Sequence, residues 1–183
     1  LDLPDLLDDK LKGLTPVVCA NLPYNITTPV LTALLECGRF RSITVMIQRE
    51  VARRICAAPG TADYGAFTLL MQYYPQPELL FTVSNTCFLP APKVTSAVIH
   101  CRSRKAPPVE VCSREMLFRT VRSGFALRRK TLVNSLQTAF PLPKERLTEI
   151  VAACGLDPSV RGERLGLAEY ARLADALAAE KEG

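Results

Sequence analysis

Short apolar runs alternate with helix-like segments in the first part of the chain. Val17 to Ala20 is apolar with two β-branched residues, and the loop from Asn21 to Pro23 follows it. This pattern predicts a buried strand that ends in a loop. A helix is expected next, with Thr28 as its cap and Pro29 at its first position. Gly38 can end that helix.

The same order of strand and helix repeats once. Ile43 to Ile47 predicts a second buried strand, and Arg49 to Ala57 predicts a helix that ends near Pro59-Gly60. Successive strand–helix units favour a parallel sheet with right-handed crossovers. A further helix is expected over Tyr64 to Tyr74.

Two later segments have the composition of strands. Leu79 to Val83 and Ser96 to Arg102 are separated by a loop that contains the proline-rich stretch from Phe88 to Pro92. We expect them to pair antiparallel at the edge of the sheet, where prolines between strands are tolerated.

Beyond Pro108 the apolar residues recur at helical spacing, which predicts a small all-α domain of three to five helices. We therefore expect an α/β domain over residues 1–103, with a partial Rossmann-like sheet, and a helical domain over 108–183. The periodic positions of the helical part are Phe118, Val121, Phe125, Leu132, Leu136, Phe140, Leu147, Ile150, Val151, Cys154, Leu173 and Leu177.

Composition narrows the class of protein. The 183 residues are 48% hydrophobic and 22% charged, so the chain can bury a core and is not disordered. No apolar run approaches the roughly 18 residues of a membrane span, and no leader peptide opens the chain. Seven widely spaced cysteines fit neither a disulfide framework nor a zinc site, so we expect free core cysteines, no metal and a cytoplasmic protein.

Positive charge is concentrated in one window of the sequence. Nine basic and two acidic residues lie from Arg102 to Lys130, so this window has a net charge of +7. The whole chain has a net charge of +5, and the residues outside the window therefore sum to −2. Such a cluster suits a nucleic-acid backbone, and a solvated helix surface is the alternative interpretation.

The loop after the first strand carries the candidate chemistry. Asn21-Leu22-Pro23-Tyr24 follows a predicted parallel strand, where α/β sheets bind their ligands. The Asn21 amide oxygen and the Pro23 carbonyl can accept hydrogens from an exocyclic amine of a nucleobase, and Tyr24 can stack on the base. A turn whose tyrosine covers the core is the alternative.

Five ordered stretches resemble the ribosomal RNA adenine N6,N6-dimethyltransferases, specifically the bacterial small-subunit (16S) family. The first is Asn21 to Leu31, with the family's target-amine motif, and the others are Gln48 to Arg54, Tyr64 to Phe67, Phe88 to Val98 and Phe125 to Leu132. The resemblance covers nearly the whole chain.

The resemblance implies an S-adenosylmethionine-dependent enzyme that dimethylates two adjacent adenines near the 3′ end of small-subunit ribosomal RNA. Asn21 and the Pro23 carbonyl would hold the target amine, with Asn21 also close to the methyl-bearing end of the cofactor. Tyr24 and Phe88 would sandwich the adenine, which must leave the RNA stack to expose its amine.

The resemblance also implies the partners. The immature 30S subunit would be the substrate, the helical domain would bind RNA and aid ribosome biogenesis, and the full-length protein would be a monomer without metal or membrane partner. The expected RNA-binding residues are Arg119, Arg122, Arg128, Arg129 and Lys130.

One part of the family pattern is missing. None of the nine glycines forms the glycine-rich cofactor loop, and the strands expected around that loop are absent. We therefore expect the C-terminal two-thirds of a longer enzyme, inactive alone, with weak or absent binding of S-adenosylmethionine.

Three alternatives stay open from the sequence. A large-subunit ribosomal RNA methyltransferase of the macrolide-resistance type would share the target-amine loop. A non-catalytic ribosome-assembly module would keep the RNA surface and lose the chemistry. A DNA adenine methyltransferase fits less well, because its target loop normally carries a second proline where Leu22 stands.

Overall fold

The computed structural model describes residues 3–180, which form two compact units. One unit comprises the chain up to Cys56 together with Met71–Ala106, and the other comprises Ala57–Leu70 together with the chain from Pro107 onward. The sequence divided the chain once, between residues 103 and 108. In the structure, Ala57–Leu70 also belongs to the unit of the C-terminal helices. Local periodicity in the sequence does not reveal such a grouping of distant segments.

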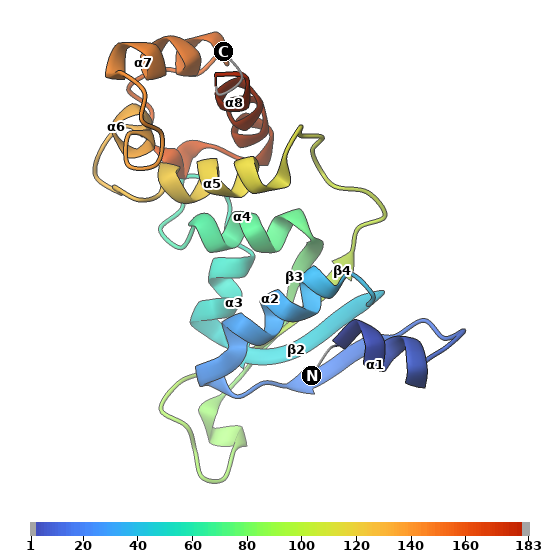
Figure 1. Cartoon of the computed structure of the whole chain (residues 1–183). Helices are drawn as coiled ribbons and strands as arrows, with labels where there is room; N and C mark the ends of the chain where they lie inside the picture. The colour runs from blue at the N-terminus through green and yellow to red at the C-terminus, as the bar shows by residue number, and fades with distance from the viewer. Residues whose placement is uncertain (1–2, 181–183) are drawn as a thin grey trace. The chain divides into compact units, whose positions relative to one another are not determined.

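The first unit is built on a four-stranded sheet of β1 (Val17–Asn21), β2 (Ser42–Gln48), β3 (Pro75–Val83) and β4 (Ser96–Ser103). The strand order is β1-β2-β4-β3 (Figure 1). β1 runs parallel to β2, and β4 pairs antiparallel with both β2 and β3. The predicted α/β class, with parallel strands and an antiparallel edge pair, is confirmed.

One face of this sheet forms the core of the unit. Every second residue of β2 from Ile43 to Ile47 is buried, and β4 buries Ile99 and Cys101 on the same alternating pattern. The short helix α3 (Arg49–Ile55) packs against β2, β3 and β4 and buries Ala52 and Ile55. This packing holds β3 and β4, which carry one site loop between them, while β1, which carries the other, is held by its pairing with β2.

The helices around the sheet differ in detail from the prediction. α2 (Thr27–Cys37) begins one residue before the expected cap and has no side-chain cap, so the expectation of Thr28 as cap was wrong. Pro29 is tolerated inside the first turn because the first four amides of a helix have no intrahelical partner. Gly38 ends the helix in the left-handed conformation, as predicted, at φ 66°.

Two further helices complete the description of this part of the chain. α1 (Leu3–Lys10) lies before β1 and was not predicted. α4 (Ala66–Tyr73) falls within the predicted helix over residues 64–74, although β3 already begins at Pro75. β3 is an edge strand, which explains why it accommodates prolines at its start.

The second unit contains the helices α5 (Arg114–Gly124), α6 (Leu132–Leu136), α7 (Lys144–Ala153) and α8 (Leu167–Ala179). Their apolar faces meet in a core that includes Leu117, Leu136, Leu147 and Leu173, all with no exposed surface. Two of the periodic apolar positions lie outside the helices: Phe125 directly follows α5, and Phe140 lies four residues after the end of α6.

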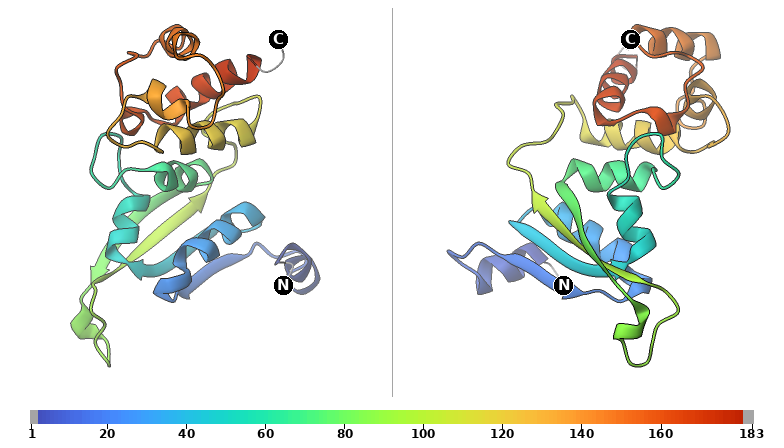
Figure 2. Two further views of the ribbon diagram at one scale, coloured as in Figure 1. Left: turned by 60° about the vertical axis from the view of Figure 1, so that its left-hand side comes forward. Right: turned by 180° about the vertical axis from the view of Figure 1, so that it is seen from behind.

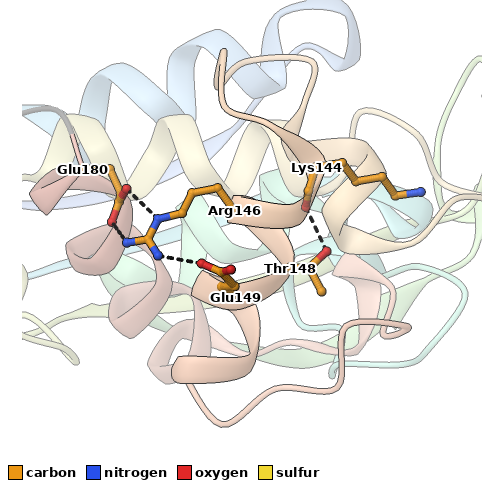
Figure 3. Close-up of polar contacts among 5 residues, drawn as sticks. All are labelled: Lys144, Arg146, Thr148, Glu149 and Glu180. Atoms are coloured by element: carbon orange, nitrogen blue, oxygen red, sulfur yellow. Dashed lines mark hydrogen bonds and ion pairs between the residues drawn. The ribbon is translucent and has the colours of Figure 1, made fainter.

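A polar cluster joins α7 to the end of α8 (Figure 3). Arg146 donates from Nε to Glu180 at 2.9 Å and from Nη1 to Glu149 at 2.7 Å, while the Thr148 hydroxyl donates to the Lys144 carbonyl at 2.8 Å. The hydrogen bonds to Glu180 and then to Glu149 raise the pKa of Arg146 above its usual range. Its positive charge is therefore balanced by two carboxylates.

The cysteines are free but are not core residues as a group. Cys101 is buried, whereas Cys19, Cys87 and Cys112 are exposed, so the expectation of core cysteines was wrong for these three. Exposure follows from their places on an edge strand, in a turn and before a helix. Within residues 3–180, no group of three or more metal-binding side chains lies together, and no helix is long and apolar enough to cross a membrane.

Candidate nucleobase pocket and RNA-binding surface

The candidate site begins where β1 ends. Asn21 is the last residue of β1 and is exposed, and its Cα is paired in register with that of Met46 in β2. The Leu22 amide donates to the Met46 carbonyl at 3.2 Å, which continues the parallel pairing by one residue. The backbone that carries the Asn21 amide is therefore held by the sheet.

The Pro23 carbonyl already has partners within the chain. It accepts a hydrogen bond from the Ile26 amide at 3.2 Å and another from the Thr27 hydroxyl at 3.1 Å. A carbonyl oxygen has two lone pairs, so both acceptor positions are used by the 3₁₀ turn Tyr24–Ile26 and the start of α2. The sequence suggested this oxygen as an acceptor for a target amine and did not reveal the competition.

Tyr24 is fixed through its hydroxyl. Tyr24 Oη lies 2.6 Å from the hydroxyl oxygen of Ser96, the fully buried first residue of β4. The half-buried tyrosine side chain is thereby tied to the sheet. Ser96 was not predicted as a site residue from the sequence, although it lies within the stretch from Phe88 to Val98 that carried the resemblance.

Phe88 comes from the β3–β4 connection, which extends beyond the end of the sheet in Figure 2. This loop is ordered by its own hydrogen bonds: the Cys87 amide donates to the Ser84 carbonyl, the Phe88 amide to the Asn85 carbonyl, and Asn85 Nδ2 to the Pro92 carbonyl. The Phe88 side chain is half-buried. A defined loop therefore presents this ring.

All four residues predicted for catalysis line one pocket of about 360 Å³. The pocket lies within the range of about 300–1,000 Å³ that is typical of small-molecule sites. No charged side chain lines it; the polar groups come from Asn21, the Tyr24 hydroxyl and the backbone. Its lining residues are Asn21, Leu22, Pro23, Tyr24, Phe88, Leu89, Pro90 and Pro92.

This arrangement suits a flat, neutral ligand with a polar edge. Among the described residues, the Tyr24 and Phe88 rings do not stack on each other. Neither ring therefore blocks the face of the other. Aromatic side chains bind bases through their faces without regard to charge. The Asn21 amide can donate or accept at the edge of such a ligand.

The predicted RNA-binding residues do not form one uniform set. Arg119 donates to the Ala139 carbonyl and lies over the Phe140 ring, with its Cζ 4.7 Å from the ring centroid. Its guanidinium therefore joins α5 to the end of the α6 segment. A sequence cannot distinguish such an internal arginine from a surface one.

The other four predicted residues are exposed. Arg122 lies on α5, and Arg128, Arg129 and Lys130 lie on the turn between α5 and α6. Arg128 Nη2 donates to the Ala62 carbonyl at 2.9 Å, which anchors that turn. Within residues 3–180 none of the four forms an ion pair with an acidic residue, so their charges are available to a ligand.

The basic window of the sequence is divided between the two units. Arg102, Arg104 and Lys105 line a cavity of about 760 Å³ in the first unit together with Arg41, whereas the residues from Arg114 onward belong to the second unit. The net charge of +7 is therefore shared between the two units, and the five predicted RNA-binding residues all belong to the second unit.

The chain is similar to one family of known proteins over nearly its whole length. The family model described as "Ribosomal RNA adenine dimethylase" matches residues 6–179. A relative from Geobacillus thermodenitrificans, named "Ribosomal RNA small subunit methyltransferase A", is 48% identical over 165 residues, which are 88% of this chain and 56% of the relative. Proteins of the same name from Geobacillus kaustophilus and Alkaliphilus oremlandii are each 44% identical over 97% of this chain and 62% or 63% of their own length.

Solved structures share the fold. A dimethyladenosine transferase from Plasmodium falciparum matches with a TM-score of 0.72 at 20% identity, over 90% of this chain and 68% of that one. The 23S rRNA methyltransferase ErmE matches with a TM-score of 0.63 at 24% identity, over 96% of this chain and 78% of that one. The chain thus spans somewhat more than half the length of the curated relatives that it matches.

Proposed function

Because the chain belongs to the ribosomal RNA adenine dimethylase family, we propose that it is the target-binding part of an enzyme that dimethylates two adjacent adenines of small-subunit ribosomal RNA. The small-subunit substrate is favoured over the large-subunit one because relatives at 44–48% identity carry the small-subunit name. Action on an immature 30S subunit, as a monomer that aids ribosome biogenesis, belongs to the same proposal.

One observation supports the proposal most strongly: an uncharged pocket at the end of β1 is lined by Asn21, Tyr24 and Phe88. In this account the adenine leaves the RNA stack and lies between the two rings, because a stacked base buries the amine that is methylated. The Asn21 side-chain oxygen then accepts one hydrogen of that amine. Orientation of this kind can lower a barrier by roughly 7–11 kcal/mol.

Either of two backbone carbonyls, that of Pro23 or that of Leu22, can be the second acceptor for the amine. The Pro23 carbonyl can take this role only if the Thr27 hydroxyl turns away from it. The neighbouring Leu22 carbonyl accepts no hydrogen bond recorded within residues 3–180, and Leu22 also lines the pocket. We retain Pro23 as the proposed acceptor when Thr27 rotates, with Leu22 as the alternative.

S-adenosylmethionine would supply the methyl group in this reaction. Asn21 is the one proposed contact to its methyl-bearing end. Among the described glycines with positive φ, Gly13, Gly38, Gly60 and Gly155, none lies in a loop that leads directly from a strand into a helix. The described residues thus fit only part of a cofactor site. We propose that the 183-residue chain binds the cofactor weakly or not at all and is inactive alone.

The proposal predicts that Tyr24 increases the affinity for RNA only when the target base is present. A fluorescein-labelled hairpin with two adjacent adenines is compared with one carrying abasic residues there. Wild-type protein should bind the adenine hairpin about 10-fold more tightly, and Tyr24→Ala should remove this preference, because base stacking contributes about 1–3 kcal/mol per base. Fluorescence anisotropy measures both affinities.

Tyr24→Phe serves as the control for this experiment. It keeps the ring and loses the hydrogen bond to Ser96, so most of the preference should remain. Equal binding of the two hairpins by the wild-type protein would contradict the proposed base pocket.

The turn between α5 and α6 is proposed to bind the RNA backbone. Changing Arg128, Arg129 and Lys130 together to alanine should weaken RNA binding about 10-fold at 0.1 M salt. The slope of log affinity against log salt concentration should fall by about 2, because three phosphate contacts are lost. Anisotropy titrations between 50 and 200 mM potassium chloride, roughly the range over which counterion release is seen, measure both quantities.

A matched control removes the same charge from other helices of the same unit. Lys144, Arg146 and Arg172 are exposed on α7 and α8, and the two arginines already pair with glutamates. Their combined alanine variant should leave the salt slope nearly unchanged. Equal losses in both triple variants would show that net charge alone determines binding.

A further inference from the structure

Leu89 is the most exposed large apolar residue in the described chain. Its relative exposure is 101%, whereas the other exposed large apolar side chains lie between 39% and 68%. It follows Phe88 directly and also lines the pocket with Asn21 and Tyr24. When a ligand covers an apolar side chain that is in full contact with water, the free energy of the complex is lowered.

The exposure of Leu89 is built into an ordered loop. Hydrogen bonds within residues 84–92 fix the turn before Phe88, and Pro90 and Pro92 restrict the backbone after it. The backbone at Phe88 is extended, with φ −122° and ψ 148°. Because successive side chains of extended backbone point to opposite sides, Phe88 and Leu89 offer separate apolar surfaces to a ligand at this pocket.

These observations lead to a second subsite beside the base pocket, an inference that rests on the proposed function. We propose that Leu89 packs against the nucleobase that neighbours the captured adenine in the RNA strand. When an adenine is extruded, its neighbour loses a stacking partner, and an apolar side chain can take that place. Leu89 is a positioning residue in this account, because it acts on the neighbouring base and not on the reacting amine.

The chemistry of the rim supports a base over a phosphate as the occupant. The pocket lining on this side consists of Leu89, Pro90 and Pro92, without a cation. A phosphate would require positive charge or amide donors, whereas the face of a purine or pyrimidine is apolar enough to cover a leucine. In the proposed substrate the neighbour of each target adenine on one side is the other adenine.

Two RNAs separate this role from a general role in the pocket. In the first, the target adenine lies between two purines; in the second, it lies between two abasic residues. Leu89→Ala should weaken binding of the first RNA about 10-fold. It should change binding of the second RNA by less than about 2-fold, because no neighbouring base remains for Leu89 to cover.

The controls are a second exposed leucine outside the pocket and a conservative change at Leu89 itself. Leu80→Ala alters a 45% exposed leucine on β3 that does not line the pocket, and it should affect neither RNA. Leu89→Met should retain most of the affinity for the first RNA. Circular dichroism of each variant checks that the fold is kept.

The outcomes distinguish the subsite from the proposed function. Equal losses with both RNAs, or no loss with either, would overturn the subsite, because Leu89 would then contact the target base itself or nothing. If wild-type protein binds neither RNA better than the matching RNA without a target adenine, the base pocket fails, and the subsite fails with it.

Discussion

Replacing Asn21 with alanine is expected to lower the rate of methyl transfer to RNA by about 100- to 1,000-fold, the usual effect of losing one preorganised polar contact at a reacting group. The amine of adenine is a weak nucleophile because its lone pair is delocalised into the ring. We propose that the Asn21 oxygen orients that amine from the end of β1, where the following amide is hydrogen-bonded to β2. The assay measures transfer of labelled methyl groups by the full-length protein.

Two variants make this result specific. Asn21→Asp keeps an acceptor oxygen and should retain more activity than Asn21→Ala. Asn25→Ala changes an exposed asparagine of the adjacent turn that does not line the pocket, and it should remain active. Retained RNA binding by Asn21→Ala would support an enzyme, whereas wild-type protein without methylation would support a non-catalytic RNA-binding module.

The assay uses the full-length protein because we propose that the 183-residue chain does not transfer methyl groups by itself. Isothermal calorimetry on that chain should detect no binding of S-adenosylmethionine at micromolar concentrations. Micromolar affinity would show that the described residues already contain the cofactor site, and would contradict this part of the account.

Replacing Gly162 with alanine is expected to destabilise the second unit by about 3 kcal/mol, at the upper end of what overpacking costs. A Cβ at Gly162 would lie 2.2 Å from the Gly124 carbonyl oxygen and 2.7 Å from the Tyr170 hydroxyl. The first contact is with backbone, which cannot turn aside as a side chain can. The Tyr170 hydroxyl also donates to the Gly162 carbonyl at 3.0 Å, and this hydrogen bond would be disturbed.

Gly162→Ala is also expected to weaken RNA binding, through the packing of Phe125. Tyr64 and Tyr170 both pack against Phe125, which begins the turn that carries Arg128, and burial raises the pKa of both tyrosines. Both therefore remain neutral hydrogen-bond donors near neutral pH. Loss of this packing should loosen the turn and weaken RNA binding as well as lower stability.

Chemical denaturation followed by circular dichroism measures the change. Gly65→Ala is the matched control, because a Cβ there meets nothing within 4 Å and Gly65 does not have positive φ. It should cost less than about 1 kcal/mol. A similar loss of stability for Gly162→Ala and Gly65→Ala would show that the close approach at Gly162 is not a tight constraint.

The parts of the fold that depend on local pattern could be predicted from the sequence. The apolar runs at β1 and β2 are short and bounded by prolines or polar residues, and both strands are present in a parallel pair. The prolines and glycines that follow them locate the loops. The pocket residues could be named because Asn21, Pro23 and Tyr24 are contiguous and Phe88 lies in a second matched stretch.

Features that depend on contacts between distant residues could not be predicted. Ser96 binds the hydroxyl of Tyr24 across 72 positions, and Arg119 reaches a carbonyl 20 residues away. Periodicity records which face of an element is apolar and says nothing about which polar partner lies opposite. The same reason explains why the sequence identified Pro23 as an acceptor without revealing that Thr27 already binds its carbonyl.

The proposed function requires that the pocket lined by Tyr24 and Phe88 receives an adenine extruded from RNA. A crystal structure of the chain bound to a hairpin with two adjacent adenines tests it most directly. We expect one adenine between the two rings, with its exocyclic amine directed at the Asn21 side chain. Bound RNA with both adenines stacked in the hairpin and nothing between the rings would contradict it.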